Sequence, residues 1–167
     1  MSILPILQYP DARLHKVAKK VDALTVTVKK LIQDMSETMY AAPGIGLAAT
    51  QVDVHQQIIV IDISETHNDL LVLINPELIS SEGENKCEEG CLSVPGIYDK
   101  VERAEKIEVR ALNMNGEEIT LKAEGILSVC IQHEMDHLQG IVFVEHLSHL
   151  KQVRIRAKLK KRLRETF

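Results

Sequence analysis

The chain of 167 residues carries a formal net charge of −4, with 45% hydrophobic and 26% charged residues. These values are typical of one soluble globular domain over residues 1–167, and they argue against a second globular unit. Aromatic residues are scarce, with no Trp, two Phe and three Tyr, so base-stacking platforms for nucleic acids are not expected.

Helical spacing of apolar residues predicts two elements in the first quarter of the chain. Asp11 is a candidate cap for a short helix, which would have Leu14, Val17 and Ala18 on one face. A longer helix is expected over about residues 27–41, where apolar residues recur at helical spacing. A Pro-Gly pair just beyond this segment ends the helix.

Four segments rich in branched residues predict β-strands, at residues 58–63, 71–74, 107–112 and 117–124. Asn115-Gly116 lies between the last two segments and is a strong signal for a hairpin. Helical patterns return at residues 126–138 and at about 148–164. This order predicts an α+β fold, in which a largely antiparallel β-sheet packs around a central helix and a C-terminal helix follows.

The N-terminus and the cysteines bear on the location of the protein. The first residues lack a basic lead, and Pro5 and Gln8 interrupt their apolar stretch, so they make a poor secretion signal. No apolar run approaches the ~20 residues that span a bilayer. Three cysteines form an odd count, which argues against a disulfide framework. A cytoplasmic protein without membrane contact is therefore expected.

Residues 133–137 read HEMDH, the H-E-x-x-H pattern of a metal site on a helix. His133 and His137 would lie one turn apart on the same helix face, where both imidazoles can reach one cation. Glu134 projects at a different angle, toward a water on the metal rather than the metal itself. A catalytic site of this kind needs a third protein ligand and one open position.

A zincin-type metallopeptidase is the alternative function that this pattern suggests. The metzincin pattern places a third His six residues after the second, where this chain has Phe143. The gluzincin pattern needs a Glu on a later helix, but Glu145 is too close and Glu165 lies in a basic tail. Neither completion of a protease site is convincing.

The third ligand is therefore sought among the cysteines. Cys130 lies seven residues before His137, about 10.5 Å along a helix axis, so it cannot join both histidines. Cys87 and Cys91 would face the same side of a strand, and geometry alone does not choose between them. Gly90 beside Cys91 lets the backbone approach a metal closely. These flanking residues favour Cys91, in a Cys/His/His site for a divalent first-row metal.

Three motifs, GIGLAATQ (44–51), EGCLS (89–93) and QHEMDH (132–137), resemble the signature motifs of the peptide deformylase family, in the same order. The similarity extends through the YPDARL start, the SVPG turn and the basic tail, and so covers nearly the whole chain. It implies a metal-dependent hydrolase that removes the formyl group from N-formylmethionine of newly synthesised bacterial or organellar polypeptides and releases formate. A bacterial cytosol is the expected location.

The resemblance also implies one Fe(2+) per chain, bound by Cys91, His133 and His137. By the usual affinity order, Zn(2+), Ni(2+) or Co(2+) could replace iron in a purified protein. Such a metal lowers the pKa of a bound water, whose proton Glu134 would accept and pass to the departing amine. Gln51, through its side-chain amide, and Leu92, through its backbone N–H, would donate to the formyl oxygen.

The expected peptide site combines an edge segment with a methionine pocket. The glycines of GIGLAATQ would let an extended peptide pair with the backbone, a mode that is indifferent to side chains. Arg103 would hold either the peptide or the Glu89 region, and Ile126 and Val129 would otherwise be ordinary core. The candidate substrate-binding residues are Ile45, Gly46, Glu89, Gly90, Arg103, Ile126, Val129 and Cys130.

The tail from Lys151 to Arg164 carries basic residues and no acid. One interpretation is an amphipathic helix packed on the domain through Leu150, Val153, Ala157 and Leu163. The other, which the family resemblance supports, is docking of a monomer onto ribosomal RNA near the exit tunnel. A non-catalytic zinc module that binds RNA is a further alternative, but it would need a fourth protein ligand.

Overall fold

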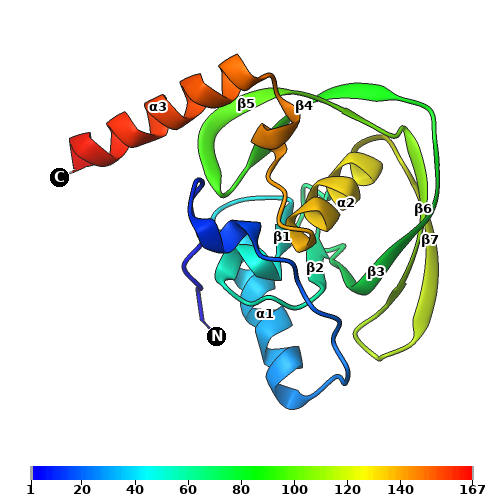
Figure 1. Ribbon diagram of the computed structural model, residues 1–167. Helices are drawn as coiled ribbons and strands as arrows, with labels where there is room; N and C mark the ends of the chain where they lie inside the picture. Colours follow the sequence, from blue (N-terminus) through cyan, green and yellow to red (C-terminus); the bar gives the residue numbers. More distant parts are fainter. Residues whose placement is uncertain (1, 167) are drawn as a thin grey trace.

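The computed structural model describes residues 2–166, which form three α-helices and two antiparallel β-sheets (Figure 1). The helices are α1 (Val26–Ala41), α2 (Gly125–Leu138) and α3 (His149–Thr166). The larger sheet has the order β1-β2-β3-β6-β7, and its strands are β1 (Gly46–Ala48), β2 (Ile58–Ile61), β3 (Leu71–Glu82), β6 (Lys106–Leu112) and β7 (Glu118–Glu124). The smaller sheet pairs β4 (Asn85–Cys91) with β5 (Val94–Arg103). The predicted α+β fold is confirmed.

Strand β2 lies between two helices, which explains its uninterrupted apolar sequence. Successive side chains of a strand point to opposite faces. Ile59 and Ile61 accordingly pack into the cluster that includes residues of α2, whereas Ile58 and Val60 pack with residues of α1. All four side chains are buried. The helix with the H-E-x-x-H pattern is thereby held against the larger sheet, at the centre of the fold (Figure 1).

The hairpin predicted around Asn115-Gly116 is confirmed, and β6 and β7 pair in register from Lys106 with Glu124 to Leu112 with Glu118. Gly116 has a φ of +78°, a conformation that favours glycine. The strand expected at residues 71–74 is longer than predicted. It continues to Glu82 because its second half pairs with β6.

The short helix after Asp11 is a four-residue 3-10 turn, Ala12–His15, and the Asp11 side chain accepts the Arg13 backbone N–H at 2.9 Å. Leu14 and Ala18 are buried as expected. Val17 is 60% exposed, so the prediction that it shares their face is wrong. The turn ends before Val17, and the chain there is extended.

Helix α3 forms where the sequence predicts it, but it packs through a different face. Ile155 and Leu159 are buried in a cluster with Val94 and Ile97 of β5. The residues expected on the packed face are exposed instead: Leu150, Val153, Ala157 and Leu163. Both sets have helical spacing, and contact with β5 selects the first. The side chain of Glu165 lies outside the described residues. No helix within residues 2–166 has the length and apolar content needed to cross a membrane.

Candidate metal centre

Cys91, His133 and His137 come together at the centre of the fold, with one donor atom of each within 4.8 Å of the others. The two histidines lie one turn apart on α2, and Cys91 is the last residue of β4. The Sγ atom of Cys91 lies 3.3 Å from Nε2 of His137. A thiolate and two imidazoles are suitable ligands for a divalent first-row metal. These three residues therefore fit the expected metal centre.

The orientation of His133 is fixed from behind by Glu89 of β4. The Nδ1 atom of His133 lies 2.8 Å from Oε1 of Glu89, which leaves Nε2 to face Cys91 and His137. Burial alone would raise the pKa of Glu89, but hydrogen bonds from Arg103 and His133 lower it below the ordinary value. An ionised Glu89 thus selects the His133 tautomer that presents Nε2 as a ligand.

Arg103 does not line the cleft. Of the two roles expected for it, peptide binding or support of Glu89, its contacts agree with the second. It is 6% exposed, and its Nε and Nη2 donate to the two carboxylate oxygens of Glu89 at 2.7 and 2.9 Å. Its Nη1 donates to Asp136 at 2.6 Å, and Asp136 also contacts His146 at 2.8 Å. The guanidinium therefore links β4 to α2 behind the metal site. A direct role for Arg103 in peptide binding is not supported.

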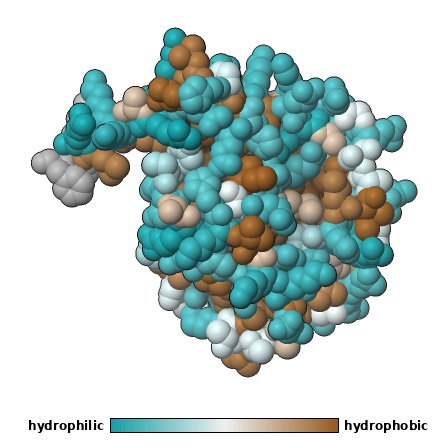
Figure 2. All heavy atoms as spheres, in the orientation of Figure 1, coloured by the Kyte–Doolittle hydropathy of each residue, from teal (hydrophilic) through white to brown (hydrophobic). Residues whose placement is uncertain are grey.

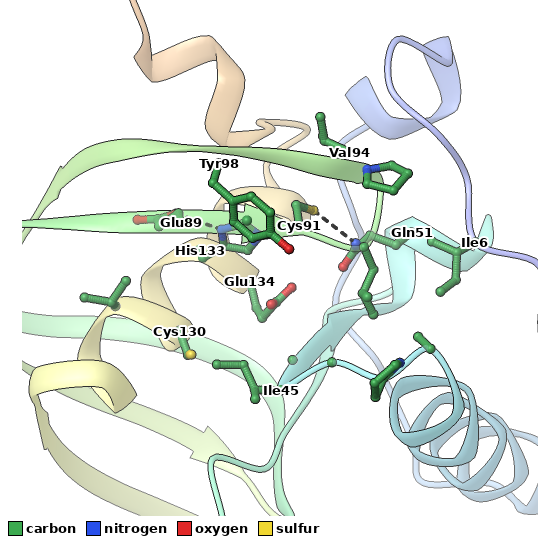
Figure 3. A pocket seen from close by; sticks show the side chains of 18 of the residues that line it. Ile6, Ile45, Gln51, Glu89, Cys91, Val94, Tyr98, Cys130, His133 and Glu134 are labelled. Carbon is green, nitrogen blue, oxygen red and sulfur yellow. Dashed lines mark hydrogen bonds and ion pairs between the residues drawn. The ribbon is translucent and has the colours of Figure 1, made fainter. Parts of the chain in front are cut away.

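Glu134 points into the same space as Cys91 and His133 (Figure 3). It is 4% exposed, and Oε1 has no hydrogen-bond partner among the described residues. Burial raises the pKa of Glu134 to about 7, so this carboxylate can both accept and release a proton near neutral pH. A Cβ atom added at Gly46 would lie 2.5 Å from Oε2 of Glu134. Glycine at position 46 is therefore needed for the carboxylate to lie where it does.

Gln51 presents its amide nitrogen to the site. Its Oε1 accepts the Ala48 backbone N–H at 3.0 Å, so Nε2 points the other way. Nε2 donates to Oγ of Ser93 at 3.0 Å and lies 3.5 Å from Sγ of Cys91 (Figure 3). Gln51 is 1% exposed and sits on a short 3-10 turn, Ala49–Val52. This geometry provides a fixed donor beside the candidate ligands.

An open cleft of about 800 Å³ lies in front of these residues. All the candidate substrate-binding residues except Arg103 line it, and so does Leu92. Burial raises the pKa of Cys130 to about 12, so this thiol stays protonated and lines the cleft as an apolar group. Sequence reasoning did not single out several other lining residues: Ile6, Gln8, Pro95, Gly96 and Tyr98. Pro95 and Gly96 belong to the SVPG turn, to which no role was assigned, and the other three come from segments that carry no local chemical pattern.

Phe143 occupies the position where a metzincin has its third histidine. It is 1% exposed, and its ring stacks on that of His133, with 6.0 Å between centroids and 29° between planes. Glu145 lies on the same 3-10 turn as Phe143, and its Oε1 lies 3.0 Å from Nδ1 of His15. Neither residue is among the groups that could hold a metal in the described part of the chain.

Comparison with known proteins agrees with this geometry. Residues 3–153 match the family described as polypeptide deformylase. Peptide deformylase 1 of Burkholderia multivorans is 65% identical over 162 residues, which cover 96% of this chain and 90% of that protein. The peptide deformylase of Neisseria meningitidis is 59% identical over 167 residues, the full length of both chains.

Two solved structures show the same fold along nearly the whole chain. A peptide deformylase from Legionella pneumophila superposes with a TM-score of 0.95 at 48% identity, covering 99% of this chain and 98% of that one. A peptide deformylase from Ehrlichia chaffeensis, in complex with actinonin, gives a TM-score of 0.93 at 41% identity, covering 97% and 98%. The metallopeptidase alternative is not favoured. The chain belongs to the polypeptide deformylase family, metalloenzymes that remove the N-formyl group from nascent peptides.

Proposed function

We propose that Cys91, His133 and His137 hold one Fe(2+) per chain and that residues 1–167 act as a single catalytic domain on N-formylmethionyl peptides. The observation that carries this proposal is the cluster of three donor atoms beside the unpartnered carboxylate of Glu134. Iron follows from the family resemblance, and Zn(2+), Ni(2+) or Co(2+) would compete for the same ligands. When bound, the metal supplies Lewis-acid polarisation and makes water a stronger nucleophile near neutral pH.

Glu134 carries out the proton transfers. Its free Oε1 accepts a proton from the attacking water, and the same carboxyl then gives that proton to the nitrogen of the departing methionine. Gln51 stabilises the charge that develops on the formyl oxygen, because Nε2 is already oriented toward the site. The backbone N–H of Leu92, which lines the cleft, is the second donor.

The peptide binds along the cleft wall formed by Ile45 and Gly46, through backbone pairing that does not depend on side chains. The methionine side chain enters the apolar part of the cleft lined by Ile126, Val129 and Cys130. Glu89 and Gly90 form part of the opposite wall. Such an arrangement would accept many different nascent chains that share an N-terminal formylmethionine.

Formate release from a formyl-Met tripeptide under anaerobic conditions tests the substrate and the metal together. We expect iron-loaded protein to release formate and zinc-loaded protein to be the poorer catalyst. Metal content is measured in both samples, so that slow formate release caused by incomplete metal loading is not mistaken for poor catalysis. An iron-loaded, folded protein that releases no formate would contradict the proposed substrate, and equal rates with both metals would contradict the choice of iron.

Gly46→Ala should lower kcat by about 100-fold, because the new methyl group displaces the Glu134 carboxylate and a shift of about 1 Å can cost this much. If the effect passes through Glu134, Gly46→Ala should have little further effect in a Glu134→Ala background. This double-mutant cycle is measured by formate release, with thermal unfolding as the check on folding. Additive losses would show that Gly46 acts independently of Glu134.

We further propose a monomer in the bacterial cytosol, with α3 docking onto ribosomal RNA near the exit tunnel. The support is an exposed series of cations on α3, Arg154, Lys158 and Lys161. Teal side chains predominate along this projecting helix in Figure 2. Phosphate contacts make such binding depend strongly on salt. The free thiols agree with a reducing compartment.

Arg154→Ala with Lys161→Ala should weaken ribosome binding and reduce its salt slope by about two, since each phosphate contact contributes about one. Both side chains are exposed, so the fold and the hydrolysis of free peptides should not change. Cosedimentation with ribosomes at several salt concentrations measures the slope. Lys29→Ala with Lys122→Ala makes the same charge change on α1 and β7 and serves as the control. Equal slopes for the two double variants would contradict docking through α3.

A further inference from the structure

Asp62 is a buried carboxylate that the proposed chemistry does not use. It follows β2 directly and is 2% exposed. Its Oδ2 accepts the Tyr40 hydroxyl at 2.6 Å and the Asp69 backbone N–H at 3.2 Å. Its Oδ1 accepts the Ser64 backbone N–H at 2.9 Å and the Ser64 hydroxyl at 2.5 Å. Four donors on one buried carboxylate make a rigid junction between α1, β2 and the loop that follows β2.

This junction lies next to the wall of the substrate cleft. Residues 42–46 line the cleft and begin two residues after Tyr40 in the sequence. The backbone N–H of Gly44 donates to the carbonyl of Met39 at 2.8 Å, in the last turn of α1. The backbone N–H of Asp62 donates to the carbonyl of Ile45 at 2.8 Å. Backbone hydrogen bonds therefore fix this wall, residues 42–46, to the end of α1 on one side and to Asp62 on the other.

The hydrogen bond between Tyr40 and Asp62 joins the two supports of this wall. We infer that Tyr40 and Asp62 are positioning residues for peptide binding, which hold residues 42–46 where the backbone of an extended substrate pairs with them. This inference rests on the proposed function. Neither side chain touches the candidate metal ligands, so the pair acts through the wall and not through the metal.

Tyr40 and Asp62 keep the same protonation states near neutral pH, so the hydrogen bond between them does not change there. Burial and the neighbouring Asp62 raise the pKa of Tyr40 to about 12. Burial would raise the pKa of Asp62, but its hydrogen bonds with Ser64, Tyr40 and the Asp69 N–H lower it to about 2. The phenol stays a donor and the carboxylate an acceptor between these values. The ring of His67 stacks on that of Tyr40 at 4.8 Å, and Tyr40→Phe would leave this contact in place.

Tyr40→Phe removes the hydroxyl alone and is the first variant to test. We expect KM for a formyl-Met tripeptide to rise about fivefold, the equivalent of one lost hydrogen bond, with kcat and iron content unchanged. The rise should be smaller for formyl-methionine amide, because this short substrate has less backbone to pair with the wall. Asp62→Asn should show the same pattern more strongly, since it removes the charge that all four donors share.

Asp34→Asn is the matched control. Asp34 is another buried carboxylate on α1, 7% exposed, but its partners are the Ser2 backbone N–H at 3.2 Å and Lys30 at 3.1 Å. Its loss should reduce stability without changing KM. An equal rise in KM for Asp34→Asn and Tyr40→Phe would overturn the inference, because general loosening of α1 would then explain both. A wild-type KM in a folded Tyr40→Phe protein would also overturn it.

Hydrogen exchange of the backbone amides of residues 42–48 gives a readout that needs no activity. Tyr40→Phe should speed exchange in this segment, whereas Asp34→Asn should not. If wild-type iron protein releases no formate, the proposed function fails, yet faster exchange would still support the positioning of the wall. Unchanged exchange in an active protein would overturn the inference and leave the proposed function intact.

Discussion

Glu134→Gln is expected to lower kcat for formate release by about 1000-fold, because a single positioned acid-base group typically contributes 100- to 10,000-fold. Glutamine has nearly the same shape as glutamate but cannot accept a proton at neutral pH. Glu134 is 4% exposed, and Gly46 lies directly against its carboxylate, so the glutamine side chain should keep the position of the glutamate. The loss should appear in kcat rather than in KM.

The metal content of the Glu134→Gln variant should equal that of the wild type, because the donor atoms come from Cys91, His133 and His137. Iron analysis and anaerobic steady-state kinetics on the same samples separate the two effects. Glu118→Gln, at an exposed position on β7, is the control for the chemistry of the substitution. A variant with full iron content and a kcat within a few-fold of the wild type would exclude Glu134 as the group that moves the proton.

The helix with the H-E-x-x-H pattern was predictable because its evidence is local. His133, Glu134 and His137 occupy one segment, and helical spacing alone places both histidines on the same face. The predicted helix, residues 126–138, begins one residue after the observed α2. The β6–β7 hairpin was predictable for the same reason, since Asn-Gly between two branched segments determines the turn.

Strand spacing alone did not choose the third candidate ligand, and Cys91 was favoured over Cys87 only by its flanking residues and by the family resemblance. Cys87 and Cys91 lie on the same strand, and their spacing leaves either one free to face α2. In the fold, Cys87 pairs with Val101, and the register shifts between Glu89 and Cys91 before Cys91 pairs with Val94. This irregularity is a property of the β4–β5 pair, which sequence periodicity did not reveal.

The packed face of α3 and the Tyr40–Asp62 junction were not predictable for a related reason. Two sets of apolar residues in α3 have helical spacing, and contact with Val94 and Ile97 decides which set is buried. Tyr40 and Asp62 lie 22 positions apart, in two elements whose local patterns say nothing about each other. In both cases the deciding contact is long-range, whereas sequence patterns report on neighbours along the chain.

Gln51→Glu is the second substitution with a large expected effect, a loss of about 100- to 1000-fold in kcat, as found for removal of one oxyanion donor. The substitution keeps the oxygen that accepts the Ala48 N–H at 3.0 Å, so the side chain should keep its orientation. It replaces the Nε2 donor with an oxygen, which repels the negative charge that develops on the formyl oxygen. The substitution therefore changes only the atom at the Nε2 position, which contacts both Ser93 and Cys91.

The Gln51 amide has two hydrogens to donate, and the structure accounts for both. One points to Oγ of Ser93 at 3.0 Å, and the other faces Sγ of Cys91 at 3.5 Å, a long contact that a formyl oxygen can replace. Ser93→Ala removes an acceptor for the first hydrogen and leaves the second in place, so it should cost much less than Gln51→Glu. Steady-state kinetics on both variants, at matched iron content, makes the comparison. If Ser93→Ala were as damaging as Gln51→Glu, the amide would serve to hold the β4–β5 turn, and the formyl oxygen would depend on the Leu92 N–H instead.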